Sequence, residues 1–199
     1  MTVTRERFEQ GFPYDQYKAQ MTRNQDRFEA NERNLIIDSA DLAAFKNLAQ
    51  PLNVLVLAED WCGDVIANLP ILGRLAAESG KLTVRVFLRD QNLDIMEQYL
   101  KDGQFRSIPV FVFLDQQFNE LGVFIERPAS VSERMSAARA TLYADHLEFG
   151  PPETPISQIP EEIRGNLMQA MATLREGTKA TDNQDVVSAL RAIVEGPQA

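Results

Sequence analysis

Hydrophobic positions in the middle of the chain change from a continuous run to helical spacing. Residues 53–59 (NVLVLAE) are almost all aliphatic, which is typical of a strand buried on both faces. Apolar residues then recur at helical intervals from Cys62 to Ser79. Gly80 follows, and glycine is common just after the last turn of a helix. The pattern therefore predicts a buried strand and then a long helix that begins at the cysteine.

The next part of the chain predicts three more strands. Residues 82–90 and 107–115 are rich in β-branched and aromatic residues, and 120–127 follow the second run after a short turn. Residues 93–103 have the spacing of a short amphipathic helix that ends at a glycine. The order of strand, helix, strand, helix and hairpin predicts an α/β fold with parallel and antiparallel pairs in one sheet.

Both flanks of this region have the spacing of helices. Residues 1–50 are expected to form an N-terminal helical extension, and residues 128–199 a C-terminal one with a proline-rich break at 149–160. The apolar stripe at 161–175 is interpreted as a face that packs on the core at 51–127, with a partner interface as the alternative. The three segments are expected to make a single domain overall.

Composition excludes several classes of function. The chain has 199 residues, of which 44% are hydrophobic, and this is enough for one ordinary core. Its formal charge of −9 argues against binding to nucleic acid or to an anionic membrane surface, since both need a basic face. No run approaches the about 18 consecutive apolar residues of a membrane span. The first residues lack the apolar core of a secretory signal, so we expect a cytoplasmic protein.

Cysteine and histidine each occur only once, and both limit the chemistry. Cys62 is the only cysteine, so the chain cannot form an internal disulfide. A structural zinc site needs about four nitrogen or sulfur ligands, so no metal site is expected. His146 is the only histidine. No neighbouring residue supports a catalytic pair with Cys62, and we interpret His146 as a solvated or capping residue.

The position of Cys62 at the predicted start of a helix is the main candidate for chemistry. The first turn of a helix has unpaired N–H groups and a positive dipole end, and both favour a thiolate over a thiol. Gly63 lets the turn close without side-chain obstruction. Ile108 and Pro109 come just before the third predicted strand. The backbone around such a proline, which is often cis, can offer an N–H and a C=O to an extended peptide.

These motifs together resemble the thioredoxin superfamily. The segment DWCGDV is similar to its W-C-G-x-C active-site turn, and Pro70 to the proline within the helix that follows. Residues 107–115 and the hairpin after them are similar to its cis-proline loop and last two strands. The closest likeness is to bacterial thioredoxin family proteins with W-C-G-D-C and a helical N-terminal extension. The resemblance implies a thioredoxin-like fold at 51–127, with a mixed sheet of four to five strands and helices on both faces.

The chain departs from the pattern of that family in its acid and thiol groups. Val65 occupies the position of the second cysteine, so a dithiol cycle within one chain is excluded. Val56 stands where many thioredoxins carry a buried acid. Glu59 and Asp60 are expected to be solvated. Asp64 would interact favourably with the helix dipole but would repel a thiolate beside it.

Three hypotheses for function remain open. The first is a protein of thiol redox homeostasis that uses Cys62 for monothiol exchange with protein or peptide thiols and disulfides. A low-molecular-weight thiol would be its co-substrate, and no other cofactor is expected. The alternative is a redox-inactive module that binds a protein or peptide in the groove of Trp61 and Pro109. The third is a dimer linked through the cysteine. The sequence leaves open the oligomeric state and whether the protein is an enzyme.

The first hypothesis assigns roles to six residues. Cys62 is the expected catalytic residue, because only a thiolate can attack a disulfide. The resemblance implies that the tryptophan before it lies on the rim of the substrate surface. The residues expected to contact the substrate are those of the turn and of the proline loop: Trp61, Gly63, Asp64, Ile108 and Pro109.

Overall fold

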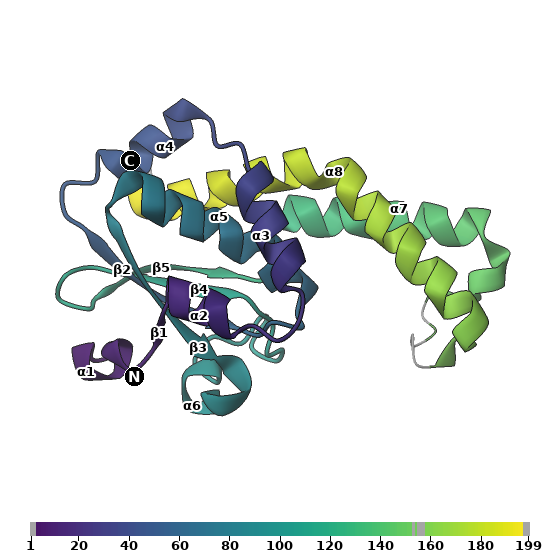
Figure 1. The fold of residues 1–199 in the computed structure, drawn as a ribbon, viewed down its shortest axis with the longest axis horizontal. Helices are drawn as coiled ribbons and strands as arrows, with labels where there is room; N and C mark the ends of the chain where they lie inside the picture. The colour runs from purple at the N-terminus through teal and green to yellow at the C-terminus, as the bar shows by residue number, and fades with distance from the viewer. Residues whose placement is uncertain (1–2, 153, 155–157, 197–199) are drawn as a thin grey trace. The chain divides into compact units, whose positions relative to one another are not determined.

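A five-stranded mixed sheet forms the centre of the fold (Figure 1). The structure is a computed structural model that describes residues 3–152, 154 and 158–196. The strand order is β1-β3-β2-β4-β5, with β2 and β3 parallel and the other neighbours antiparallel. The prediction of an α/β fold with a mixed sheet is therefore confirmed. The five strands are β1 (Phe12–Pro13), β2 (Leu52–Ala58), β3 (Leu82–Leu88), β4 (Val110–Leu114) and β5 (Glu120–Ile125).

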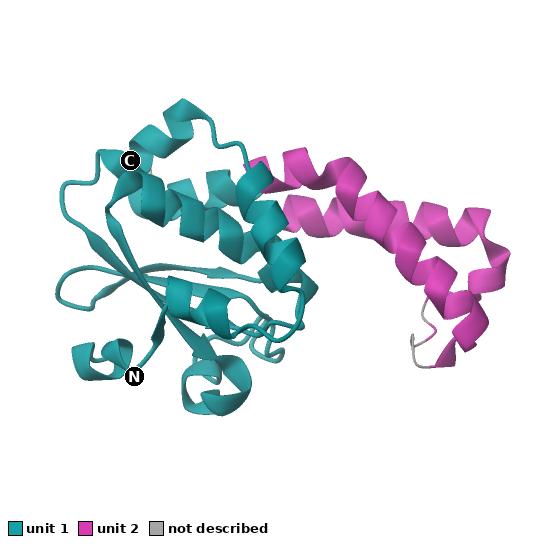
Figure 2. Cartoon of the chain, in the orientation of Figure 1, with its two compact units in different colours: residues 1–127, 186–199 teal, residues 128–185 magenta. Residues whose placement is uncertain are grey.

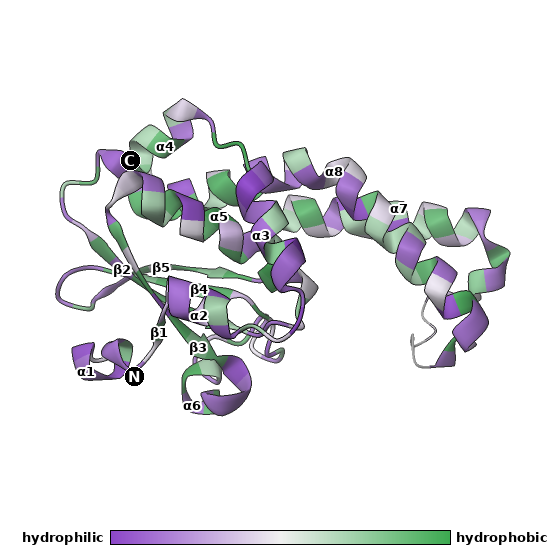
Figure 3. Ribbon diagram, viewed as in Figure 1, coloured by the Kyte–Doolittle hydropathy of each residue, from purple (hydrophilic) through white to green (hydrophobic). Residues whose placement is uncertain are grey.

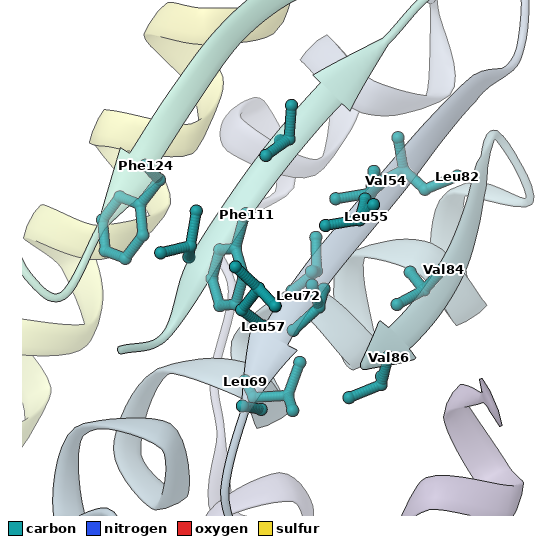
Figure 4. Packing of buried hydrophobic residues seen from close by; sticks show 14 of the residues in the cluster. Val54, Leu55, Leu57, Leu69, Leu72, Leu82, Val84, Val86, Phe111 and Phe124 are labelled. Carbon is teal, nitrogen blue, oxygen red and sulfur yellow. The ribbon is translucent and has the colours of Figure 1, made fainter. Parts of the chain in front are cut away.

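The continuous aliphatic run predicted as a buried strand is β2, the central strand of the sheet. All seven of its residues are buried, between β3 on one edge and β4 on the other. Side chains from four strands and from helix α5 (Gly63–Ser79) meet in one core (Figure 4). The members labelled there are Val54, Leu55, Leu57, Leu69, Leu72, Leu82, Val84, Val86, Phe111 and Phe124. This core fixes the end of β2 and the start of α5, between which the cysteine lies.

Helices cover both faces of the sheet, as expected. The N-terminal extension contains α1 (Arg5–Glu9), α2 (Tyr14–Gln20), α3 (Gln25–Asn34) and α4 (Ser39–Lys46). Helices α3 and α4 contact α5, and the three lie on one side of the sheet in Figure 1, whereas α1 lies on the other. The predicted helical extension is confirmed, but it is divided into four short helices, with the edge strand β1 between the first two.

Two predicted helix ends have different outcomes. Helix α5 ends at Ser79 as predicted, and Gly80 follows with φ = 64°, a conformation that glycine adopts without strain. The helix expected at 93–103 is wrong beyond Met96, since α6 spans only Leu93–Met96, after a 3-10 turn, η1 (Arg89–Gln91). Backbone pairing between Lys101 and Phe105 closes a tight turn there instead. This local turn has replaced the last residues of the predicted helix.

The C-terminal part of the chain contains α7 (Ala129–Asp145), a 3-10 turn, η2 (Leu147–Phe149), and α8 (Glu161–Glu195). The chain divides into two compact units (Figure 2). The first contains Met1–Arg127 and Val186–Ala199, and the second contains Pro128–Asp185. The expectation that residues 128–199 pack on the core stays a prediction for the second unit.

The last turns of α8 belong to the core of the first unit. Val186, Val187 and Leu190 are fully buried there. A Cβ atom added at Gly122 of β5 would lie 2.9 Å from the side chain of Ile193, so helix and strand approach each other closely. The absence of a side chain at position 122 thus makes room for the returning helix.

The second unit has a small apolar cluster and a group of ion pairs of its own. Tyr143 and Leu167 are buried in that cluster, together with two residues of the connection between the helices. Arg134 of α7 pairs with Asp182 at 2.7 Å and with Asp185 at 2.5 Å. Figure 3 shows α7 and α8 as alternating hydrophobic and hydrophilic residues. Within the described part of the chain, no helix is both long and apolar enough to cross a membrane.

Candidate thiol site

Cys62 lies between the end of β2 and the first turn of α5. It is the N-cap residue of α5, with extended backbone angles, and Gly63 is the first helical residue. Its backbone N–H donates to the carbonyl of Glu59 (3.2 Å), and its own carbonyl accepts from Ile66 (3.1 Å). The thiol is therefore at a helix N-terminus, as the sequence predicts, and the turn before it is closed by a backbone hydrogen bond.

The thiol contacts the proline loop. The Sγ of Cys62 lies 3.5 Å from the carbonyl oxygen of Ile108, to which the S–H donates. The peptide bond between Ile108 and Pro109 is cis. Ile108 is buried, whereas Cys62 is only half-buried. The structure thus brings together three of the residues that the sequence assigned to the site, from two segments far apart in the chain.

The surroundings of Cys62 favour the neutral thiol. Burial is the largest effect and raises the pKa of Cys62, and the carboxylates of Asp64 and Glu126 raise it further. The backbone N–H groups of Val65 and Asp64 lower this pKa, but they do not compensate. The N–H groups of the first helical turn thus favour the thiolate, as expected, but burial and the two carboxylates outweigh them. The hydrogen bond to the Ile108 carbonyl needs the same neutral form, because only the protonated sulfur can donate.

Four charged side chains form a connected group beside the thiol, which we call the charged cluster: Asp64, Lys101, Glu126 and Arg127. Arg127 pairs with Asp64 at 3.1 Å and with Glu126 at 2.5 Å, and Lys101 also pairs with Glu126. Burial alone would lower the pKa of Arg127, but its two carboxylate partners raise it overall. The two carboxylates therefore keep Arg127 in its charged form at the edge of the site.

Backbone contacts fix the position of Glu126. Its φ is 62°, which is uncommon for a residue other than glycine. Its N–H donates to the carbonyl of Pro109 (2.7 Å), and its carbonyl accepts from Nδ2 of Asn68 in α5 (2.8 Å). The segment after β5 is thereby tied to the proline loop and to the helix of the cysteine. Sequence analysis missed Glu126 and Arg127, because only the pairing of β4 with β5 brings them to Cys62, and it missed Asn68, whose partner in this segment is distant in sequence.

Trp61 lies next to the thiol and is partly open to solvent. Its side chain is 44% exposed, and the guanidinium of Arg89 lies 5.0 Å from its ring centroid. Arg89 also donates to the carbonyl of Arg106 (3.0 Å), at the start of the proline loop. The tryptophan thus presents an apolar surface beside Cys62, with a stacked arginine on one face.

The expectation that Glu59 and Asp60 are solvated is wrong. Glu59 is buried, and its carboxylate accepts from the backbone N–H of Asp90 (2.8 Å). Burial raises the pKa of Glu59. Asp60 is half-buried, and its carboxylate accepts from Thr22 and Arg23 of the N-terminal extension. Acidic loop residues are usually solvated. Glu59 and Asp60 differ because they bind segments that are distant in the sequence, which only the structure shows.

His146 belongs to the second unit and is exposed. Its Nδ1 lies 2.9 Å from a carboxylate oxygen of Glu148, and its ring stacks on Phe149 with centroids 5.0 Å apart. These contacts are local, as expected for a residue without a catalytic role. Across the residues that the structure describes, no three His, Cys, Asp or Glu side chains are grouped as a metal site would require.

Comparison with known proteins agrees with the fold. The family model described as thioredoxin matches residues 11–140, which include the whole sheet and the cysteine. The chain belongs to the thioredoxin family. Val65, which the sequence analysis places at the position of the second cysteine of the turn, is fully buried in the core. In this thioredoxin-family chain, that position contributes to packing and has no thiol.

Two solved structures share the fold of this thioredoxin-family chain over nearly its whole length. One is a protein of unknown function from Pseudomonas aeruginosa, with a TM-score of 0.67, 21% identity and coverage of 98% of each chain. The other is an HIV epitope scaffold, with a TM-score of 0.65, 19% identity and coverage of 96% of each chain. At this identity, both show the fold alone. No curated protein matches the sequence.

Proposed function

We propose that this thioredoxin-family protein acts in thiol redox homeostasis by monothiol exchange at Cys62. The observation that carries the proposal is the position of the thiol. It is half-buried at the start of α5, within 3.5 Å of the Ile108 carbonyl and next to the exposed Trp61. An extended segment of a protein or peptide that lies along Ile108 and Pro109 would bring a disulfide to the sulfur. The other proposed substrate contacts are Gly63 and Asp64.

The exchange has two balanced steps. In the first, the thiolate of Cys62 attacks one sulfur of a mixed disulfide, forms a new disulfide with it and releases the other sulfur as a thiolate. In the second, the thiolate of a low-molecular-weight thiol attacks the sulfur bound to Cys62. It takes that sulfur as a new disulfide and releases Cys62 as a thiolate. The external thiol is needed because Val65 cannot resolve the intermediate. A reducing compartment such as the cytoplasm supplies it.

A glutathione mixed-disulfide reduction assay tests the proposal. The wild-type protein is expected to accelerate the release of glutathione from a glutathionylated peptide, and Cys62→Ser is expected to abolish the acceleration. Mass spectrometry of a reaction trapped with acid should show one glutathione on the wild type and none on the variant. Activity of Cys62→Ser equal to that of the wild type would refute monothiol catalysis.

A second cysteine provides a sharper test of the resolving step. Val65→Cys restores a thiol three residues after Cys62 in the first turn of α5. This variant is expected to form an internal disulfide after the first exchange and so to release the substrate without an external thiol. Cys62→Ser/Val65→Cys is the matched control and should remain inactive, because the attacking thiol is lost. A wild type that needs no external thiol for turnover would contradict the proposed second step.

The raised pKa of Cys62 supports one alternative, a module that binds an extended peptide without thiol chemistry. In that case Trp61 and Pro109 would contribute the binding surface, and the neutral thiol would contribute only packing. Selection from a displayed library of cysteine-free peptides distinguishes the two functions. Enrichment that Trp61→Ala abolishes and Cys62→Ala preserves would support the module. Enrichment that neither substitution changes would exclude binding at this groove.

A further inference from the structure

The turn before Cys62 is held by a segment of the N-terminal extension, which we call the 22–24 clamp: Thr22, Arg23 and Asn24. The Oδ2 of Asp60 accepts from the backbone N–H of Thr22 (2.7 Å), from its hydroxyl (3.0 Å) and from the N–H of Arg23 (3.0 Å). The side-chain amide of Asn24 donates to the backbone carbonyl of Asp60 (2.8 Å). Four hydrogen bonds therefore join the clamp to one residue, which is two positions before the cysteine.

The clamp is rigidly supported because it connects two helices that pack on the core. Met21, at the end of α2, is buried, and so are Tyr17 of α2 and Phe28 of α3. Asn24 is the N-cap residue of α3 with φ = 57°, and its carbonyl accepts from the N–H of Phe28 (2.9 Å). The donors that hold Asp60 thus belong to a fixed surface, and not to a mobile loop.

A buried hydroxyl from the same segment lies near the turn. The Tyr17 hydroxyl is inaccessible to solvent and has no hydrogen-bond partner among the described residues. Burial raises the pKa of Tyr17, and the nearby groups of Asp60, Glu59 and Cys62 raise it further. The N-terminal extension therefore places a buried hydroxyl near the turn and also holds the turn through hydrogen bonds.

We propose that the 22–24 clamp is part of the thiol site and that Asp60 is a positioning residue for Cys62. Through Asp60, the clamp fixes Trp61 and Cys62 against the Ile108 carbonyl. This inference rests on the proposed function, because it assigns to the extension a role in presenting the thiol for exchange. Release of the turn should expose the sulfur to small reagents and, at the same time, misalign it for a disulfide held along the proline loop.

Alkylation of the single cysteine measures the position of the turn without any disulfide substrate. The rate of iodoacetamide labelling is measured against pH in the folded protein. The limiting rate at high pH reports the accessibility of the thiolate, and the midpoint of the curve reports the pKa of Cys62. Asp60→Ala is expected to raise the limiting rate by about tenfold, and Asn24→Gly by about threefold, because they remove three and one, respectively, of the four bonds between the clamp and Asp60. Glycine keeps the backbone of position 24 unstrained. The emission of Trp61, the only tryptophan, should shift to longer wavelength in both variants.

Two control variants separate positioning from charge and from loss of stability. Asp60→Asn removes the charge but retains an oxygen that can accept from the clamp, so its limiting rate should stay closer to that of the wild type than the rate of Asp60→Ala. Asp38→Ala removes a carboxylate that caps α4 by accepting from the Ala40 N–H (2.8 Å), and it should leave the labelling rate unchanged. Circular dichroism confirms that each variant is folded.

The outcomes decide the inference separately from the proposed function. Faster labelling together with slower glutathione exchange in Asn24→Gly supports positioning, since a general loss of structure would not move the two rates in opposite directions. Labelling of Asp60→Ala and Asn24→Gly at the wild-type rate overturns the inference. A shifted midpoint with an unchanged limiting rate also overturns it, because Asp60 would then act through charge alone. Faster labelling in a protein whose wild type lacks exchange activity supports the clamp and rejects monothiol catalysis.

Discussion

The two sides of Cys62 are held by different kinds of interaction. On the side of residues 59–61, carboxylates accept hydrogen bonds from backbone N–H groups of distant segments, as Glu59 does from Asp90 and Asp60 from the clamp. On the side of Asp64, the charged cluster pairs carboxylates with cations. The first side fixes where the sulfur lies, and the second determines the charge around it. The first side therefore contributes to the position of the thiol, and the second adds to the larger effect of burial on its ionisation.

Among the substitutions that test this comparison, removal of Arg127 should have the largest effect on stability and on thiol reactivity. Arg127→Ala leaves the carboxylates of Asp64 and Glu126 half-buried without their shared partner. The loss of a buried counter-ion is expected to lower the free energy of unfolding by about 3 kcal/mol. Loss of this cation should also raise the pKa of Cys62 further and slow its alkylation at neutral pH, although Lys101 still pairs with Glu126. Chemical denaturation and labelling of the same sample measure both effects.

Arg127→Lys is the matched control because it keeps the positive charge. Lysine cannot reproduce the planar contacts of a guanidinium, so an intermediate loss of stability is expected. The alkylation rate should stay near that of the wild type. Equal stability of Arg127→Ala and the wild type would show that the cluster contributes nothing to folding.

Asp64→Asn should have the next largest effect, and with the opposite sign for reactivity. The wild-type labelling rate is expected to rise with pH, with a midpoint above the usual value for a free thiol, because the pKa of Cys62 is raised. Asparagine removes one charge that disfavours the thiolate and leaves Arg127 without one of its carboxylate partners. The midpoint should therefore fall, and labelling at neutral pH should become several-fold faster.

An exposed acid elsewhere gives the control for general charge effects. Asp94 pairs with Arg7 and is mostly exposed, so Asp94→Asn should leave the labelling midpoint unchanged. If Asp64→Asn and Asp94→Asn shift the midpoint equally, the cluster does not set the ionisation of the thiol.

The smallest effect is expected for the arginine stacked on Trp61. Arg89→Gln removes a cation from the face of an exposed ring, and such contacts contribute at most about 1 kcal/mol. Stability should change little, while the fluorescence of Trp61 should change because its immediate neighbour differs. The alkylation rate should be unchanged, since Arg89 belongs to neither side of the thiol. A large change in labelling would place Arg89 among the positioning residues.

The sequence predicted those parts of the molecule that depend on local patterns. The buried strand, the long helix ending before Gly80 and the strand–hairpin order could be recognised because burial and helix termination leave direct signals in the sequence. The helix at 93–103 was overestimated because a tight turn, closed by the pairing of Lys101 with Phe105, replaces its last residues. Local periodicity cannot detect such competition.

The candidate site was predictable only where a motif lies within one segment. Cys62 and Trp61 belong to one turn, and the proline loop to one other. The charged cluster and the clamp each join segments far apart in the chain, so no sequence pattern marks Arg127 or Asp60 as part of a site. Both are charged residues in loops, and such residues are ordinarily predicted to be exposed to solvent. Only burial and specific partners distinguish them.

The return of α8 to the sheet has a consequence for the order of folding during synthesis. Val186, Val187 and Leu190 complete the core of the first unit, and Ile193 covers Gly122 of β5. The ribosome makes these residues only after the whole of Pro128–Asp185, so the emerging core keeps an apolar face open during that time. In the cell, the segment that bears the thiol is therefore made well before the last side chains that stabilise its support.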